Sequence, residues 1–154
     1  MKRLSEMNFE RRNNHPLDVL GIGKRPLIKD WLDEMGVEGY TINDDFTIDI
    51  DNRVLFVNLS SKKLKILPDF IQFNNVNAAF YIGDNELESL RGFPRRITSH
   101  FSCSGNRLTS LEGCPGYVGG EFRCFENKKQ FTEDYVRGLC DVRGKIKNKF
   151  KTES

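Results

Sequence analysis

The four cysteines are the residues of this sequence best suited to metal or redox chemistry: Cys103, Cys114, Cys124 and Cys140. Their separations of 11, 10 and 16 residues contain no Cys-x-x-Cys pair and match no zinc signature. Cys103 and Cys124 are 21 residues apart, and Ile82 stands 21 residues before Cys103. A thiol that takes the place of isoleucine is expected to be a small buried apolar side chain. We therefore expect reduced cysteines that pack in a core, with no metal and no cofactor, and a redox role as the alternative.

Nucleophilic catalysis by a thiol would need one of the two histidines, His15 or His100, beside it. His100 precedes Cys103 by three residues, so the pleat of a strand would send the two side chains to opposite faces. The sequence also contains neither Gly-x-Ser-x-Gly nor His-Glu-x-x-His. These observations predict a protein that is not an enzyme.

Two other segments have residue types found in ligand loops. Gly21-Ile22-Gly23-Lys24 lacks the spacing of a phosphate-binding loop and a preceding strand, so we interpret it as a flexible lead into a helix. Asp44, Asp45, Asp49 and Asp51 do not follow the residue order of a calcium loop. We interpret them as the outward acids of a hairpin, with calcium binding or a catalytic carboxylate pair as the alternatives.

An internal repeat of 21 residues runs through the middle of the chain and contains Cys103, Cys114, Cys124 and His100. It is carried by Phe80, Phe101 and Phe122, by Asn85, Asn106 and Asn127, and by the pairs Leu90 and Leu111, Gly92 and Gly113, and Pro94 and Pro115. An earlier, degenerate copy runs from Val57 to Leu67 with an offset of 23 residues. A period near 21 around an asparagine lies in the leucine-rich-repeat range.

Within each copy the apolar residues alternate as they do in a strand. Val76, Ala78, Phe80 and Ile82 have period two, and the next copies keep it. We expect one short strand per repeat, with phenylalanine stacked on phenylalanine and cysteine on cysteine. The asparagine that follows each strand is expected to bond backbone groups of the turn. Leu-x-x-Leu-x-Gly-x-Pro would then form the return limb.

The two ends are expected to cap this solenoid. A helix over Pro26–Met35, stopped by Gly36, precedes a hairpin of Tyr40–Ile42 and Phe46–Ile50. Near the other end, Thr132 is expected to N-cap a second helix whose Tyr135, Val136 and Leu139 cover the last repeat. Val142 and Ile146 would add a final strand.

The fold class predicted is therefore α+β, a small leucine-rich-repeat-like β-solenoid of three to four repeats in a single domain, residues 1–154. The expected organisation is a mobile basic N-terminus, a helix and hairpin cap, the repeats, a C-terminal helix cap and a basic tail. Their ranges are 1–14, 15–52, 53–130, 131–146 and 147–154.

Phe101–Pro115, read as Phe-x-Cys-x-x-Asn-x-Leu-x-Ser-Leu-x-Gly-Cys-Pro, resembles the short leucine-rich-repeat-like proteins of large tailed bacteriophages. Trp31–Gly36 with Tyr40–Asp45 resembles the entry segment of those proteins, and Phe131–Ile146 their closing segment. The resemblance covers about residues 15–146. It implies the solenoid fold and a viral origin, and it implies no common reaction.

The candidate binding residues are those that alternate with the core along the strands. On a leucine-rich-repeat sheet they would align in rows on the concave side, where aromatic and arginine side chains are the usual anchors of an interface. Cover by the basic tails, or incidental exposure, are the alternatives. The residues are Phe56, Asn58, Tyr81, His100, Ser102, Glu121 and Arg123, with Phe125 just beyond the last strand.

The distribution of charge leaves two partner classes open. Residues 1–29 carry seven Lys and Arg against three acids, and residues 128–154 carry eight against four. Our first expectation is a host protein, bound in the cytoplasm to counter a defence or redirect a host enzyme. The alternative is nucleic acid held by the basic termini, with Lys145, Lys147, Lys149 and Lys151 on phosphates. No segment is apolar enough to predict a membrane span, and we expect a monomer or a weak homo-oligomer.

Overall fold

The computed structural model describes residues 23–149, and its first element is helix α2, Lys24–Glu34. The helix starts two residues before the predicted position and ends one residue before it. Leu27, Trp31 and the other apolar residues of its inner face are buried. Gly36 ends the helix with a φ of +77°, a left-handed conformation that favours glycine. Residues 1–22, which include His15 and part of the Gly21–Lys24 segment, and the tail residues 150–154 lie outside the described residues.

The predicted hairpin follows the helix and is confirmed. Strands β1 (Tyr40–Ile42) and β2 (Ile48–Ile50) pair antiparallel, with Tyr40 opposite Ile50. The Asn43 N–H donates to the carbonyl of Thr47 across the turn, at 2.8 Å. Ile48 and Ile50 are fully buried, so this hairpin contributes the first apolar layer of the solenoid.

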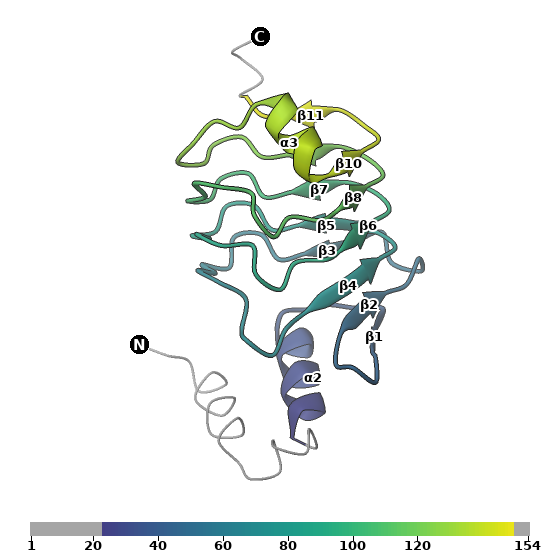
Figure 1. Ribbon diagram of the computed structural model, residues 1–154. Coiled ribbons are helices and arrows are strands. Elements are labelled where there is room, and N and C mark those ends of the chain that lie inside the picture. Colours follow the sequence, from purple (N-terminus) through teal and green to yellow (C-terminus); the bar gives the residue numbers. More distant parts are fainter. Residues whose placement is uncertain (1–22, 150–154) are drawn as a thin grey trace.

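From β2 onward the chain winds as a β-solenoid of about four turns, stacked in one column in Figure 1. Each turn contributes one strand to each of two sheets, and the strands that follow β2 pair parallel to their neighbours. Sheet A has six strands in the order β1-β2-β4-β6-β8-β10, and sheet B has five in the order β11-β9-β7-β5-β3. The remaining bounds are β3 Phe56–Asn58, β4 Phe73–Val76, β5 Ala79–Tyr81, β6 Arg96–Ile97, β7 Phe101–Ser102, β8 Tyr117–Val118, β9 Phe122–Arg123, β10 Asp141–Val142 and β11 Ile146–Lys147.

The expectation of one strand per repeat is wrong. Val76 belongs to β4 in sheet A and Phe80 to β5 in sheet B, with a corner between them. The side chains alternate through the corner because Val76, Ala78, Phe80 and Ile82 all point to the same buried core. A period of two therefore reports the inward side correctly but does not reveal where the backbone bends.

The expected stacking of the core is confirmed. Phe101 lies between Phe80 and Phe122, with ring centroids 6.4 and 5.0 Å away, and the rings of all three are fully buried. Cys103 and Cys124 occupy the same inward position in successive turns and are also fully buried. Each turn thus buries its apolar side against the next, as a solenoid requires.

The repeated asparagines bond the turns as predicted. The Asn106 amide nitrogen donates to the carbonyls of Ile82, Cys103 and Ser104, and its oxygen accepts the Leu87 N–H at 3.0 Å. Asn85 and Asn127 make corresponding bonds one turn earlier and one turn later. Each asparagine satisfies backbone groups that the bend leaves without ladder partners.

Near its C-terminus the described chain forms helix α3, Glu133–Leu139, and then β10 and β11. Thr132 caps the helix as predicted, because its hydroxyl accepts the Tyr135 N–H at 3.1 Å. Val136 is buried, but Leu139 is 43% exposed, so the expectation that Leu139 covers the last repeat is wrong. The single strand expected from Val142 and Ile146 is also wrong, because the segment turns the same corner and gives one strand to each sheet.

Neither helix in residues 23–149 is long and apolar enough to cross a membrane.

Candidate functional site

The candidate binding residues lie on the outward side of sheet B. Strand register places Asn58 beside Tyr81, Tyr81 beside Ser102, and Ser102 beside Arg123. The residues between them in each strand, such as Phe80 and Phe101, point into the core. The predicted alignment in rows is therefore confirmed for these positions. We call the outward surface formed by the predicted candidates the sheet B face: Phe56, Asn58, Tyr81, His100, Ser102, Glu121, Arg123 and Phe125.

One end of the sheet B face is aromatic. The rings of Phe56 and Tyr81 lie 6.2 Å apart between centroids, on adjacent strands. Phe56 is 53% exposed although it is a large apolar side chain, and Tyr81 is partly exposed. Tilted aromatic pairs at this distance attract each other. The two rings therefore form an apolar surface that is in contact with solvent.

The other end of the sheet B face is charged. The Arg123 guanidinium donates from Nε to the Glu121 carboxylate at 3.1 Å. This bond, together with the positive charges of Arg123 and Lys147, holds the pKa of Glu121 below its usual value. The carboxylate therefore stays ionised at neutral pH and fixes the direction of the arginine.

His100 is attached to this charged end through its ring. Its Nδ1 accepts the Glu121 N–H at 2.9 Å, so Nε2 is the ring nitrogen turned away from that bond. The ring lies over Gly120, where a Cβ atom would collide with it. A glycine at this position thus leaves room for the imidazole. The sequence signal is a Gly-Gly pair in the copy where the preceding repeat has Thr98-Ser99.

Phe125 lies just after β9, as expected, and is partly exposed. Its N–H donates to the Ser104 hydroxyl at 3.1 Å, and its carbonyl accepts the Gly105 N–H. These two bonds fix the backbone that carries the ring.

The thiols of Cys103 and Cys124 are buried, which disfavours their ionised form. Burial raises the pKa of Cys124 to about 12 and, together with nearby thiols, raises that of Cys103 well above its ordinary value. His100 points outward while Cys103 is fully buried, so the expected separation of the two side chains is confirmed. Cysteine reacts as the thiolate, which these sites disfavour.

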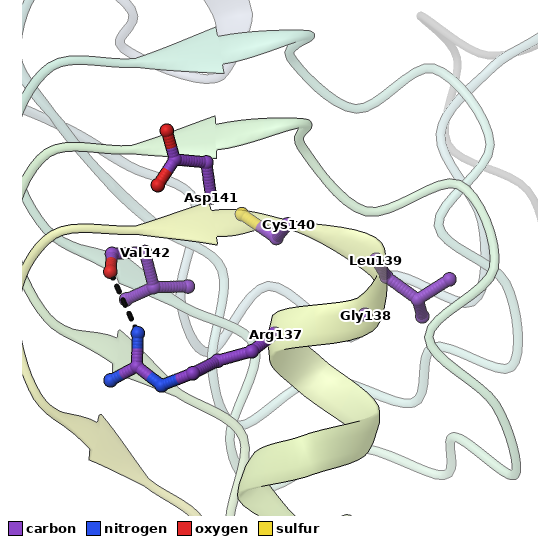
Figure 2. Close-up of a pocket in the computed structure, with 6 residues that line it drawn as sticks. All are labelled: Arg137, Gly138, Leu139, Cys140, Asp141 and Val142. Atoms are coloured by element: carbon purple, nitrogen blue, oxygen red, sulfur yellow. Dashed lines mark hydrogen bonds between the residues drawn. The ribbon is translucent and has the colours of Figure 1, made fainter.

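A shallow pocket of about 370 Å³ lies beside the end of α3 and is lined by residues 137–142. The Arg137 guanidinium donates to the Val142 carbonyl at 2.8 Å, a bond that is dashed in Figure 2. The pKa of Cys140, also in this pocket, is raised to about 12, chiefly by burial. The Arg137 side chain in this pocket thus bonds backbone, and burial disfavours the thiolate of Cys140.

Three of the four acids of the hairpin accept hydrogen bonds from the protein itself. Asp45 accepts from the Thr47 hydroxyl at 2.6 Å, Asp49 from the Asn75 N–H at 3.0 Å, and Asp51 from the Arg53 guanidinium at 2.7 Å. Within residues 23–149 no group of three or more His, Cys, Asp or Glu side chains is arranged to hold a metal ion.

Two features of the surface escaped the sequence analysis. Lys147, assigned to the basic tail, is instead part of β11 and pairs with Arg123, so it extends the row of the sheet B face. On the outward side of sheet A, Tyr117 lies with the guanidinium carbons of Arg96 and Arg143 at 3.9 and 5.8 Å from its ring centroid. The interval of 21 residues between Arg96 and Tyr117 was the available signal for this second aromatic position.

Comparisons with known proteins add no further constraint: no family model, curated protein or solved structure matches the chain.

Proposed function

We propose that this protein is a non-catalytic binding module that holds a protein partner on the sheet B face. The observation that carries the proposal is the register that brings an exposed aromatic pair and an oriented arginine onto one surface. Phe56 and Tyr81 supply apolar area, and Arg123 supplies planar donors. Tyrosine, tryptophan and arginine are enriched among the residues that dominate interface energies.

The rigidity of this surface favours binding. Tyr81, Ser102 and Arg123 are each followed or preceded by fully buried residues of the core stack. The partner therefore meets a surface whose backbone is already ordered, which lowers the entropic cost of association. The buried, protonated thiols and the outward His100 support a role without catalysis.

We also propose the finer assignments of the fold. The repeats are leucine-rich-repeat-like, with the asparagine of each turn bonded to backbone and the sheet B face as the concave side. Helix α2 with the β1–β2 hairpin is the N-terminal cap, supported by the buried Leu27, Trp31 and Ile48. Helix α3 is the C-terminal cap, supported by the buried Phe131 and Val136.

The partner we propose is a bacterial host protein in the cytosol. Its support is the resemblance of Phe101–Pro115 to short repeat proteins of large tailed bacteriophages, whose setting is the infected cell. Binding would then blunt a host defence or redirect a host enzyme. No membrane partner is part of this proposal.

Affinity capture tests the proposed class of partner. The tagged full-length chain is incubated with bacterial lysate, with and without nuclease, and the recovered proteins are identified by mass spectrometry. We expect one host protein to be recovered at near-equal yield in both samples. Recovery that vanishes after nuclease treatment would contradict protein binding through this surface.

Nucleic-acid binding is the second candidate, favoured by the position of the lysines. Lys147 continues the row of Arg123, and Lys145 precedes it on the segment that pairs with β9. Lysines along one sheet edge suit phosphates without reading sequence. In this case the logarithm of the affinity for a duplex probe should fall with the logarithm of salt concentration by about 0.9 for each phosphate contact. A flat salt response counts against it.

A further inference from the structure

Sheet B ends at β3, whereas sheet A has one further strand at the same end of the molecule, because β1 pairs with β2 of the same turn. In Figure 1 the hairpin extends the sheet A side of the column below β4. Among residues 23–149 no strand pairs with the second side of β3. That side of the strand is an edge with its backbone groups turned outward.

The ladder identifies the groups on the open side. The carbonyl of Leu55 accepts the Ala79 N–H at 3.1 Å, and the Leu59 N–H donates to the Tyr81 carbonyl at 2.7 Å. Peptide groups alternate between the two sides of a strand. Backbone groups of Leu55, Val57 and Leu59 are thus turned toward β5. The backbone N–H and C=O groups of Phe56 and Asn58 face the open side of the strand.

This edge lacks the usual protection against pairing. Leu55 is 85% exposed and Phe56 53%, and the residues from 54 to 60 carry no charge. Edge strands are usually guarded by charged side chains, proline or bulges. The opposite edge of sheet B follows that rule, because Lys145 and Lys147 flank Ile146 there. One edge of the same sheet therefore repels a second copy and the other does not.

We propose that β3 pairs antiparallel with β3 of a second copy of this chain, about a two-fold axis at Val57. Phe56 would then lie opposite Asn58 of the second copy, and Asn58 opposite Phe56. These are the residues whose N–H and C=O groups are turned outward, so each pair can exchange both of its hydrogen bonds. Both partners in this pairing use the same strand, so the interface is isologous.

A second copy fits this edge on grounds of charge and symmetry. The uncharged segment approaches itself without like-charge repulsion, and its donors and acceptors are self-complementary about Val57. The pairing would join two sheets B into one continuous surface. Because the strand is short, the interface is small and the dimer weak. This inference does not rest on the proposed partner of the sheet B face.

Sedimentation of the full-length chain over about 5–500 µM tests the proposal, since that range spans the affinity expected of a small interface. We expect a monomer–dimer equilibrium that Phe56→Lys weakens at least about tenfold, because the two copies of residue 56 are diagonal neighbours across the axis and would bring like charges together. The matched control is Ile66→Lys, which makes the same kind of change at a side chain 44% exposed on the limb that follows β3. We expect the control to dimerise as the parent chain does.

Amide hydrogen exchange at Phe56 and Asn58 distinguishes the other occupants of the edge. Protection that increases with protein concentration is the expected result. A chain that stays monomeric throughout the range overturns the proposal, as does a dimer that survives Phe56→Lys. Full protection of both amides in the monomer also overturns it, since the edge would then already be covered within one chain.

Discussion

Asn106 makes more contacts than its size suggests, since one side chain bonds four backbone groups in two successive turns. It is 8% exposed, so water cannot replace those bonds. A buried backbone group left without a partner costs about 1–3 kcal/mol. The asparagines at this position are therefore structural, and their regular spacing requires no ligand.

Asn106→Ala should lower the free energy of unfolding by about 2–4 kcal/mol, because several buried backbone groups lose their partner. Urea denaturation at neutral pH measures this change. Asn77→Ala is the matched control, since Asn77 is exposed at a corner of the solenoid, and its effect should stay within about 0.5 kcal/mol. Equal effects of the two substitutions would show that the asparagine bonds do not stabilise the turns.

The buried thiols give the protein a pH-dependent stability at alkaline pH. The pKa of Cys124 is raised from its ordinary 9.0 to about 12 in the fold. The folded state thus favours the neutral thiol, and this contribution is complete below pH 9 and is lost as the pH rises toward about 12. The free energy of unfolding should therefore fall between pH 8 and pH 10.5 by about 1–2 kcal/mol per buried thiol.

Cys124→Ala should reduce that fall by the contribution of one thiol, although it lowers stability at pH 8 because it leaves a cavity. Denaturation of both proteins under reducing conditions at the two pH values provides the comparison. An identical pH dependence in the parent and the variant would refute the assignment.

At the scale of elements, local signals predicted more than periodicity did. Thr132 with the acids that follow it, and Gly36 after an amphipathic stretch, located helix boundaries because capping depends on a few adjacent residues. The alternation from Val76 to Ile82 predicted the inward side chains but not the corner, since both sheets enclose one core. Lys147 was missed as a strand residue because the last turn is 24 residues long instead of 21.

Two glycines of the structure differ in whether a side chain could replace their hydrogen atom. Gly92 has a φ of +87°, and a Cβ there would collide with the Ile71 carbonyl oxygen. Gly92→Ala should therefore destabilise the fold by about 2 kcal/mol or more. Gly138 is the control: it lies in α3, where a Cβ meets no atom within 4 Å.

Gly138→Ala should stabilise the protein by about 0.5 kcal/mol through helix propensity. Thermal unfolding of the two variants measures both effects. A Gly92→Ala variant as stable as the parent would contradict the close approach of the two turns.

At the scale of the whole molecule, the stacking of the core residues determines which outward residues lie side by side on the surface. Phe80, Phe101 and Phe122 hold successive strands in register, so the neighbouring outward residues Tyr81, Ser102 and Arg123 must align. The candidate site was therefore derivable from the repeat. Contacts made by individual side chains were not, because the Arg123–Glu121 bond and the Arg96–Tyr117 contact depend on rotamers that a repeat does not encode.

The sheet A surface supplies a control for the central claim. Tyr117 and Arg96 are the same residue types as Tyr81 and Arg123, on the outward side of the other sheet. Replacing either pair by alanine removes one tyrosine and one arginine without touching the core.

The most direct test is to compare host-protein capture by the parent chain, Tyr81→Ala/Arg123→Ala and Tyr117→Ala/Arg96→Ala, all after nuclease treatment. Circular dichroism and thermal unfolding confirm first that both variants are folded. We predict that the sheet B double variant loses the captured protein, with an affinity lower by about 30- to 700-fold if each anchor contributes about 1–2 kcal/mol. The sheet A double variant should capture it as the parent does. Undiminished capture by Tyr81→Ala/Arg123→Ala would contradict binding through the sheet B face.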